Sequence, residues 1–148
     1  MISNLKIKDM NANLLTNDGD KVFALKDIQI KSGLAQFFLK FQNEKFSGES
    51  TYTFEVFTDQ ILHFTGNLER MIDANDIQEV TLNDLESDDF VRIEKLDSLG
   101  HFRLTTRIGG GQNLCHLDAS FDFDQTALPD FLRGIRKAIS VAQEDECM

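Results

Sequence analysis

Alternation of apolar and polar residues, followed twice by helical spacing, is the feature that most limits how this chain can fold. In the alternating segments every second side chain is apolar, as at Phe37, Leu39 and Phe41, which is typical of a β-strand with one buried face. Over residues 61–72, and again over 128–139, apolar residues recur every three or four positions, as in an amphipathic helix. Because strands in series followed by a helix are typical of antiparallel sheets, this order predicts an α+β fold.

Each half of the chain is expected to contribute four strands and one helix. In the first half the strands are expected at about residues 4–8, 22–30, 35–41 and 46–56, and the helix at 58–74 with Thr58 as its N-cap. In the second half the strands are expected at about residues 77–82, 90–96, 101–108 and 114–124, followed by a helix capped by Thr126. A change of phase near Lys26 and Asp27 predicts a bend in the second strand. The predicted architecture is two antiparallel four-stranded sheets with two helices.

The length and self-similarity of the chain favour one domain. A chain of 148 residues can bury a core without disulfide bonds. A shift of 67 residues places residues 53–56 on 120–123 and Phe64 on Phe131, but such periodic patterns overlay readily, so a true repeat and a chance match both stay open. We therefore expect a single domain over residues 1–142 and a polar, frayed tail over 143–148.

Aromatic and cysteine content indicates a cytoplasmic protein with a phenylalanine-rich core. Thirteen Phe stand against one Tyr and no Trp, and because Phe has no polar tip most of these rings are expected to be buried. Cys115 and Cys147 are too few for a disulfide framework and are expected to stay reduced. We find neither a signal peptide nor the ~20 apolar residues that a membrane helix needs, so a cytoplasmic location is expected.

The charge of the chain limits its partners. Fifteen Lys and Arg against 25 Asp and Glu give a net charge of −10. Affinity for nucleic acid comes mainly from cationic side chains that release counterions from phosphate, so neither nucleic acid nor an anionic membrane is an expected partner. The charge indicates either a role in solubility or a partner that is itself basic.

The candidate catalytic and metal-binding side chains are too scattered to predict an active site. His63, His101 and His116 fall on one expected helix and two expected strands, without the spacing of zinc ligands. Cys115 directly precedes His116, so the two side chains point to opposite faces of a strand, and Cys115 is interpreted as a buried small residue. The segment 109–111 is glycine-rich but lacks the residues of a phosphate-binding loop.

One strand face gathers several carboxylates. Asp118, Ser120, Asp122 and Asp124 alternate with apolar residues and are interpreted as a solvated face rather than as a general acid–base pair. We therefore expect a protein that is not an enzyme and that has no metal site and no cofactor.

One acidic segment is the candidate binding surface. Its seven carboxylates lie within 17 residues that contain no Lys or Arg: Asp73, Asp76, Glu79, Asp84, Glu86, Asp88 and Asp89. Wherever these residues fold, they are expected to form a local negative patch, with the polar face of the helix at 58–74 beside it. Two interpretations stay open, a solvated loop and a surface that docks on a cationic cleft.

Two motifs resemble a known family. Phe46-Ser47-Gly48 opens a predicted strand, and Phe121-Asp122-Phe123-Asp124-Gln125-Thr126-Ala127-Leu128-Pro129 leads into the last predicted helix. An FSG strand start and an F-x-x-DQT-x-LP run before the final helix resemble the WapI-type bacterial immunity family. The resemblance covers residues 46–140, while the first 45 residues match only in their strand pattern.

The resemblance implies a function but no site residues. It implies an antidote that binds and neutralises the C-terminal domain of a toxin delivered by a neighbouring cell, as in contact-dependent growth inhibition. Many such toxins are basic nucleases, which suits a partner of charge −10. The motifs themselves have structural interpretations, with Gly48 at a backbone turn and Thr126 and Pro129 at a helix start.

A second resemblance concerns architecture alone. Four strands and a helix, repeated, are similar to the Whirly fold, whose members bind single-stranded DNA, but the lysine-rich strand motif is missing and the charge is opposite. We therefore expect an immunity protein that acts as a monomer or weak homodimer. The alternative is a regulatory domain that binds a ligand or protein unrelated to toxins.

Overall fold

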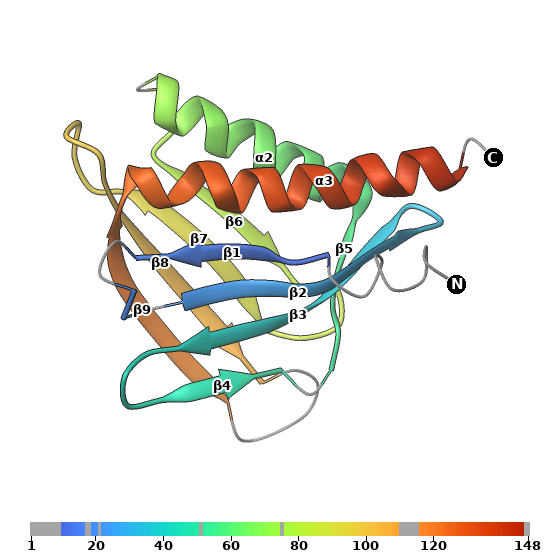
Figure 1. Ribbon diagram of the computed structural model, residues 1–148, viewed down its shortest axis with the longest axis horizontal. Coiled ribbons are helices and arrows are strands. Elements are labelled where there is room, and N and C mark those ends of the chain that lie inside the picture. The colour runs from blue at the N-terminus through green and yellow to red at the C-terminus, as the bar shows by residue number, and fades with distance from the viewer. Residues whose placement is uncertain are drawn as a thin grey trace.

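Two antiparallel sheets and two helices form the fold, which confirms the predicted α+β class (Figure 1). A computed structural model describes residues 10–16, 19–20, 22–50, 52–74, 76–109 and 116–146. The strands of the first sheet are β1 (Ala12–Leu15), β2 (Val22–Lys31), β3 (Leu34–Gln42), β4 (Ser47–Glu49) and β5 (Phe54–Phe57). Those of the second sheet are β6 (Glu79–Asn83), β7 (Phe90–Lys95), β8 (His101–Ile108) and β9 (Leu117–Asp124). The helices are α2 (Thr58–Asp73) and α3 (Leu128–Glu146), with a 3₁₀ turn, η1 (Gln125–Ala127), before α3.

The first sheet has five described strands because one predicted strand is divided. The segment predicted as a strand at 46–56 forms β4, which pairs with one end of β3, and β5, which pairs with the other. Between them, the Ser50 hydroxyl accepts a hydrogen bond from the Leu39 amide, and the Ser50 amide donates to the Leu39 carbonyl. The strand predicted at 4–8 lies outside the described residues, and the first described strand is β1.

The predicted bend in the second strand is confirmed. The register between β2 and β3 shifts between Lys26 and Gln29, and Asp27 has a φ of 55°. The Asp27 amide donates to Oδ1 of Asn11 at 2.9 Å, which replaces a ladder hydrogen bond at the bulge.

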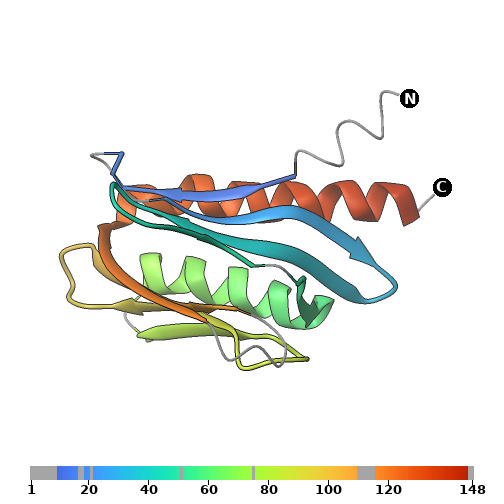
Figure 2. The same cartoon turned by 90° about the horizontal axis from the view of Figure 1, so that it is seen from below.

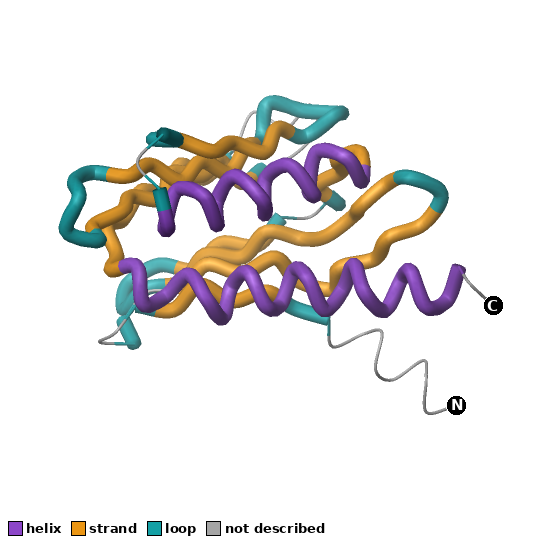
Figure 3. Tube along the Cα trace, turned by 90° about the horizontal axis from the view of Figure 1, so that it is seen from above, coloured by secondary structure: helices purple, strands orange, loops and turns teal. Residues whose placement is uncertain are grey.

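The sheets lie face to face, with the core between them. Figure 2 shows them as two layers, with α3 beside the first sheet and α2 close to the second, and Figure 3 shows the two helices side by side. The rings of Phe41 and Phe121 join the layers, with centroids 5.7 Å apart. The expected phenylalanine-rich core is confirmed, because nine of the 13 rings are buried: Phe23, Phe37, Phe41, Phe54, Phe64, Phe102, Phe121, Phe123 and Phe131.

Both predicted helix caps are wrong by one or two residues. Phe57 is the N-cap of α2, and its amide donates to Oε1 of Gln60 at 3.0 Å, whereas the buried Thr58 hydroxyl has no hydrogen-bond partner among the described residues. Asp124 caps the turn before α3 by accepting from the Thr126 amide at 3.1 Å. Thr126 therefore lies inside η1, two residues before α3 begins, because the carboxylate at the end of β9 already holds its amide.

The structure also corrects the expected turn at Gly48 and the expected frayed tail. Gly48 lies inside β4 rather than at a turn, and a Cβ atom there would overlap the Leu117 side chain of the facing sheet. The tail predicted at 143–148 overlaps α3, which continues to Glu146, while residues 147 and 148 lie outside the described residues. Among the described segments, no helix has the length and apolarity to cross a membrane.

Candidate functional site

The acidic segment is divided by β6 rather than gathered into one patch. Asp73 ends α2 and Asp76 follows it, whereas Glu79 is the first residue of β6. The remaining four carboxylates lie beyond the other end of β6, in the loop of residues 84–89, which we call the acidic loop. Since a strand rises ~3.3 Å per residue, the four steps along β6 separate the two groups by about 13 Å. The expected patch is therefore divided into two groups of carboxylates, because an extended strand cannot bring its two ends together.

Asp84 attaches the acidic loop to the first sheet. Its Oδ1 accepts a hydrogen bond from the Glu55 amide of β5 at 2.9 Å, and its Oδ2 accepts one from the Ser87 hydroxyl. The Leu85 amide donates to the Glu55 carbonyl at 3.0 Å, which adds a second bond to β5. Asp84 is half-buried by these contacts, so its role is to hold the loop.

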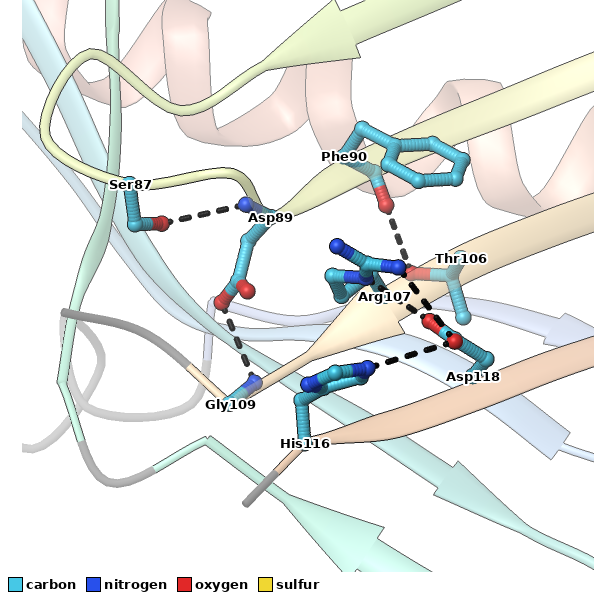
Figure 4. A network of polar contacts seen from close by, with 8 residues as sticks. All are labelled: Ser87, Asp89, Phe90, Thr106, Arg107, Gly109, His116 and Asp118. Carbon is cyan, nitrogen blue, oxygen red and sulfur yellow. Dashed lines mark hydrogen bonds and ion pairs between the residues drawn. The ribbon is translucent and has the colours of Figure 1, made fainter. Parts of the chain in front are cut away.

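Asp89 attaches the same loop to the second sheet, as Figure 4 shows. The residue is buried, its Oδ2 accepts from the Gly109 amide at 3.2 Å, and its own amide donates to the Ser87 hydroxyl at 3.1 Å. Both ends of the acidic loop are therefore fixed by carboxylates that serve the fold. Asp84 and Asp89 were predicted as docking residues, but their hydrogen bonds point inward, to backbone amides and Ser87, rather than to a partner.

The other five carboxylates are exposed and differ in their pairing. Asp76 forms an ion pair with Arg70, and Glu79 lies 3.7 Å from Nε of Arg92. Within the described part of the chain, no hydrogen bond or ion pair involves the carboxylates of the remaining three residues, which are Asp73, Glu86 and Asp88. The acidic loop therefore presents two carboxylates without an ion pair beside exposed Leu85, and Asp73 presents a third such carboxylate at the far end of β6.

A groove connects the two acidic ends. It lies between α2 and β6, has a volume of about 290 Å³, and is lined by every residue of β6. From α2 it receives Gln60, His63, Phe64 and Asn67. These α2 residues were not singled out by the sequence, since their spacing along α2 is that of any helix face and only the packing of α2 beside β6 turns that face toward a strand edge.

Most of the chain's net charge lies in one segment, which supplies both walls of this groove and the acidic loop. Residues 58–89, which span α2, β6 and the acidic loop, contain nine Asp and Glu and one Arg, a net charge of −8 out of −10. Cations of neighbouring elements offset part of this charge, since Arg136 pairs with Glu69, Arg92 lies near Glu79, and Nζ of Lys95 donates to the Met71 carbonyl. The remaining charge lies on the exposed carboxylates at the two ends of β6. The region therefore fits a basic partner.

The exposed face of the second sheet carries paired charges. Nε of Arg103 lies 2.7 Å from Asp122, and Nε of Arg107 lies 2.9 Å from Asp118. The hydrogen bond from Arg107 is the main cause that lowers the pKa of Asp118, which keeps this carboxylate ionised. A carboxylate held ionised by arginine is suited to an ion pair rather than to proton donation, in keeping with a solvated sheet face.

The three histidines stay apart. His63 lines the groove, Nδ1 of His101 lies 2.7 Å from Asp97, and Nε2 of His116 lies 3.4 Å from Asp118. Among the described residues, no three His, Cys, Asp or Glu side chains are placed to hold a metal ion. Cys115 and residues 110 and 111 of the glycine-rich segment lie outside the described residues.

A larger groove, of about 650 Å³, lies between β1 and α3. Its lining includes Asn11, Asn13, Asp130, Arg133 and Lys137. Charges of both signs meet here, since Arg133 forms an ion pair with Asp130. This groove therefore shows no preference for the charge of a partner.

The exposed pair of Asp97 and His101 makes the β7–β8 hairpin sensitive to pH. Their hydrogen bond is the largest cause both of the lowered pKa of Asp97 and of the raised pKa of His101. The stabilisation linked to His101 is complete below its ordinary pKa of 6.5 and is lost as the pH rises through the raised value. The stabilisation linked to Asp97 is present above its ordinary pKa of 3.8 and is lost as the pH falls through the lowered value.

We expect Asp97→Asn to return the pKa of His101 toward its ordinary value in an NMR titration, because the hydrogen bond to a carboxylate is removed. Asp130→Asn, which removes an equal charge on α3, is the control and should leave the His101 titration unchanged. An unchanged pKa of His101 in Asp97→Asn would show that the pair does not form in solution.

The geometry of the acidic loop and the groove is suited to recognition of a partner. Two unpaired carboxylates are held on a loop with both ends fixed, and a groove along a strand edge leads from them to a third.

Comparison of the chain with protein-family models, with curated proteins and with solved structures finds no match to any of them.

Proposed function

We propose that this chain is an immunity protein that binds and neutralises a cognate secreted toxin domain, with a basic nuclease as the target class, by covering its active site or its substrate-binding surface. One observation carries the proposal, namely that exposed carboxylates without an ion pair in the described segments lie at both ends of the strand β6 that lines the groove: Asp73, Glu86 and Asp88. The FSG and F-x-x-DQT-x-LP motifs, which resemble those of the WapI-type family, supply the biological context.

Electrostatics links this surface to a nuclease. An enzyme that binds a phosphate backbone gathers Lys and Arg at its cleft, because neutralising phosphates releases their counterions. A surface with carboxylates that lack their own cations complements such a cleft, and complementary charges speed the encounter of the two proteins. Glu86 and Asp88 are two such carboxylates, since neither side chain forms an ion pair within the described segments.

The rigidity of the acidic loop supports the same role. Ordering a loop on binding lowers affinity, so a loop that is already held in place loses less conformational entropy. Asp84 and Asp89 hold this loop to both sheets and leave Leu85, Glu86 and Asp88 exposed. Such a loop can offer one apolar contact beside two charges.

We further propose that the protein acts in the cytoplasm without catalysis of its own, as a monomer or weak homodimer. A toxin delivered into the cell meets its substrate there, so its antidote has to be present in the same compartment. Occlusion needs no reacting groups in the inhibitor, which suits a surface whose carboxylates are exposed or paired with arginine.

Calorimetric titration with the toxin C-terminal domain encoded directly upstream tests the proposal. At low salt we expect nanomolar affinity, and at moderate salt weaker binding, because screening reduces attraction between exposed charges. Tight binding that salt does not affect would retain immunity and exclude the acidic surface. If a folded toxin domain does not bind, the proposal is wrong, and a regulatory domain unrelated to toxins becomes the better description.

Charge reversal on the acidic loop should slow association with the toxin domain. In the double variant Glu86→Lys, Asp88→Lys, we expect the association rate constant to fall at least tenfold at low salt, because steering by these charges is lost. Stopped-flow mixing at several salt concentrations measures this effect, and its salt dependence should weaken. Asp84 and Asp89 are left unchanged, since replacing them would release the loop.

A matched control distinguishes the effect of the charges on the acidic loop from the effect of the total charge of the protein. The double variant Glu44→Lys, Glu144→Lys changes the total charge by the same amount at exposed positions in the β3–β4 hairpin and on α3. It should reduce the association rate constant much less than the loop variant does. Equal reductions in the two variants would assign the effect to total charge and exclude docking at the acidic loop.

A further inference from the structure

The edge of β6 that faces α2 carries unpaired backbone groups. Beyond one end of β6 the Lys95 amide donates to the Gln78 carbonyl at 2.9 Å, and beyond the other end the Asp84 amide donates to the Asp89 carbonyl at 3.0 Å. Both pairs continue the β6–β7 register. Hydrogen-bonded and non-hydrogen-bonded pairs alternate in an antiparallel ladder, so Val80 and Leu82 form the bonds to β7.

The intervening residues turn their backbone groups to the free edge. Glu79, Thr81 and Asn83 direct three N–H and three C=O groups away from β7, and β6 is the last strand of its sheet. Within the parts of the chain that the structure describes, no hydrogen bond joins these groups to another strand. A row of unpaired donors and acceptors of this kind is a template for a further strand.

The groove beside this edge keeps the unpaired backbone groups of β6 accessible to a further strand. The backbone of α2 is paired within the helix and cannot satisfy the strand edge. Instead α2 presents the polar side chains of Gln60, His63 and Asn67 across the groove, and all five residues of β6 line the opposite wall. An edge strand beside a helix is an arrangement that accepts an extended peptide by strand addition.

We propose that an extended basic segment of the partner protein pairs with β6 as an added strand in the groove between α2 and β6. The identity of this partner as a toxin domain rests on the proposed function, whereas the docking mode rests on the edge and its charge. Backbone hydrogen bonds to Glu79, Thr81 and Asn83 supply affinity, and charges at the two ends of the segment select the partner.

Charge selects a basic segment over a second copy of this chain. Asp73 lies near one end of β6, and Glu86 and Asp88 lie beyond the other, so cationic residues about four positions apart in an added strand would each approach a carboxylate. Antiparallel pairing of β6 with β6 of a second copy would bring Asp73 of one copy toward Glu86 and Asp88 of the other. Repulsion between like charges disfavours that dimer.

Hydrogen exchange of the complex with the upstream toxin domain tests the docking mode. Binding should slow exchange at least tenfold at the amides of Glu79, Thr81 and Asn83, because these amides gain hydrogen bonds. The amides of Val80 and Leu82 already bond to β7 and should change less. A toxin that binds and leaves the three edge amides unprotected would overturn strand addition while the immunity function stands.

Substitution of Thr81 provides an independent test. Proline at this position removes an N–H that faces the free edge and leaves the β6–β7 ladder intact, a position at which edge strands tolerate proline. We expect Thr81→Pro to weaken toxin binding at least tenfold and Thr81→Ala, which keeps the N–H, to change it less than about threefold. Equal affinity of the two variants would contradict the proposal, and if Thr81→Pro does not fold the exchange experiment decides.

A peptide probe separates failure of strand addition from failure of the proposed function. If the toxin domain does not bind, the probe is a heptapeptide of alternating lysine and threonine, followed by NMR of the three edge amides. Shifts and slower exchange at these amides, absent with a lysine–proline peptide of equal charge, would support strand addition without a toxin. If both peptides leave the edge amides unchanged, strand addition is wrong as well.

Discussion

Replacing Phe121 with alanine is expected to lower the free energy of unfolding by about 3–5 kcal/mol. The ring of Phe121 lies in β9, and its centroid is 5.7 Å from that of Phe41 in the facing sheet and 6.0 Å from that of Phe123. Removing it takes away the ring that connects the two sheets and leaves a cavity that rigid strands fill poorly. Urea denaturation followed by circular dichroism measures the loss.

Phe46 provides the matched control for this truncation. Its side chain is 64% exposed at the start of the FSG motif, so Phe46→Ala removes the same atoms without opening a cavity. We expect its free energy of unfolding to change by less than about 0.5 kcal/mol. Similar losses in the two variants would mean that Phe121 does not connect the sheets as described.

Alanine at Gly134 should destabilise the protein although alanine favours helices. A Cβ atom at this position of α3 would lie 2.6 Å from the Asn11 carbonyl oxygen and 2.7 Å from Cα of Ala12 in β1. Both neighbours are backbone atoms, so relief requires the helix and strand to separate, at a cost of about 1–3 kcal/mol or more. This cost exceeds the ~1 kcal/mol that replacing glycine with alanine contributes to a helix.

Replacing Gly66, the helical glycine of α2, with alanine is expected to have the opposite effect on stability. A Cβ atom there meets no other atom within 4 Å, so Gly66→Ala should stabilise the protein by about 1 kcal/mol. Thermal unfolding of the two variants under identical conditions compares them directly. An increase in melting temperature for both would show that α3 and β1 are not in close contact in solution.

Local periodicity predicted most of the secondary structure. The strands at 101–108 and 22–30 and the helix at 58–74 were predicted at nearly their observed bounds, because side-chain alternation reports directly which residues face the core. The bend near Asp27 was also predictable, since a bulge changes which residues share a face. These features depend on residues close together in the chain.

The division of the fourth predicted strand was not predictable from alternation. Residues 46–56 contain apolar residues at strand spacing, but Ser50 bonds to the Leu39 backbone and separates β4 from β5. The caps at Phe57 and Asp124 were missed for a similar reason, because a preferred residue such as Thr58 or Thr126 acts as a cap only where the preceding strand releases the chain.

At the candidate site, composition identified the region but not the roles of its residues. The seven carboxylates were found by their abundance, and the same residue type proved to have different environments. Asp84 and Asp89 accept hydrogen bonds from the backbones of Glu55 and Gly109, which lie 29 and 20 residues away in the chain. Only contacts between distant segments separate carboxylates that hold the loop from Glu86 and Asp88, which face outward.

The sequence by itself determined the α+β class, the amphipathic helices and the acidity of residues 58–89, because periodicity and charge are properties of neighbouring residues. The tertiary structure alone decided that β6 separates the acidic residues into two groups and that its free edge faces α2 across a groove. A strand becomes an edge only through the order in which strands pair, and a helix face becomes the wall of a groove only through packing. Both properties depend on residues far apart in the chain, so the acidic segment alone could not reveal that its carboxylates lie at the two ends of an edge strand.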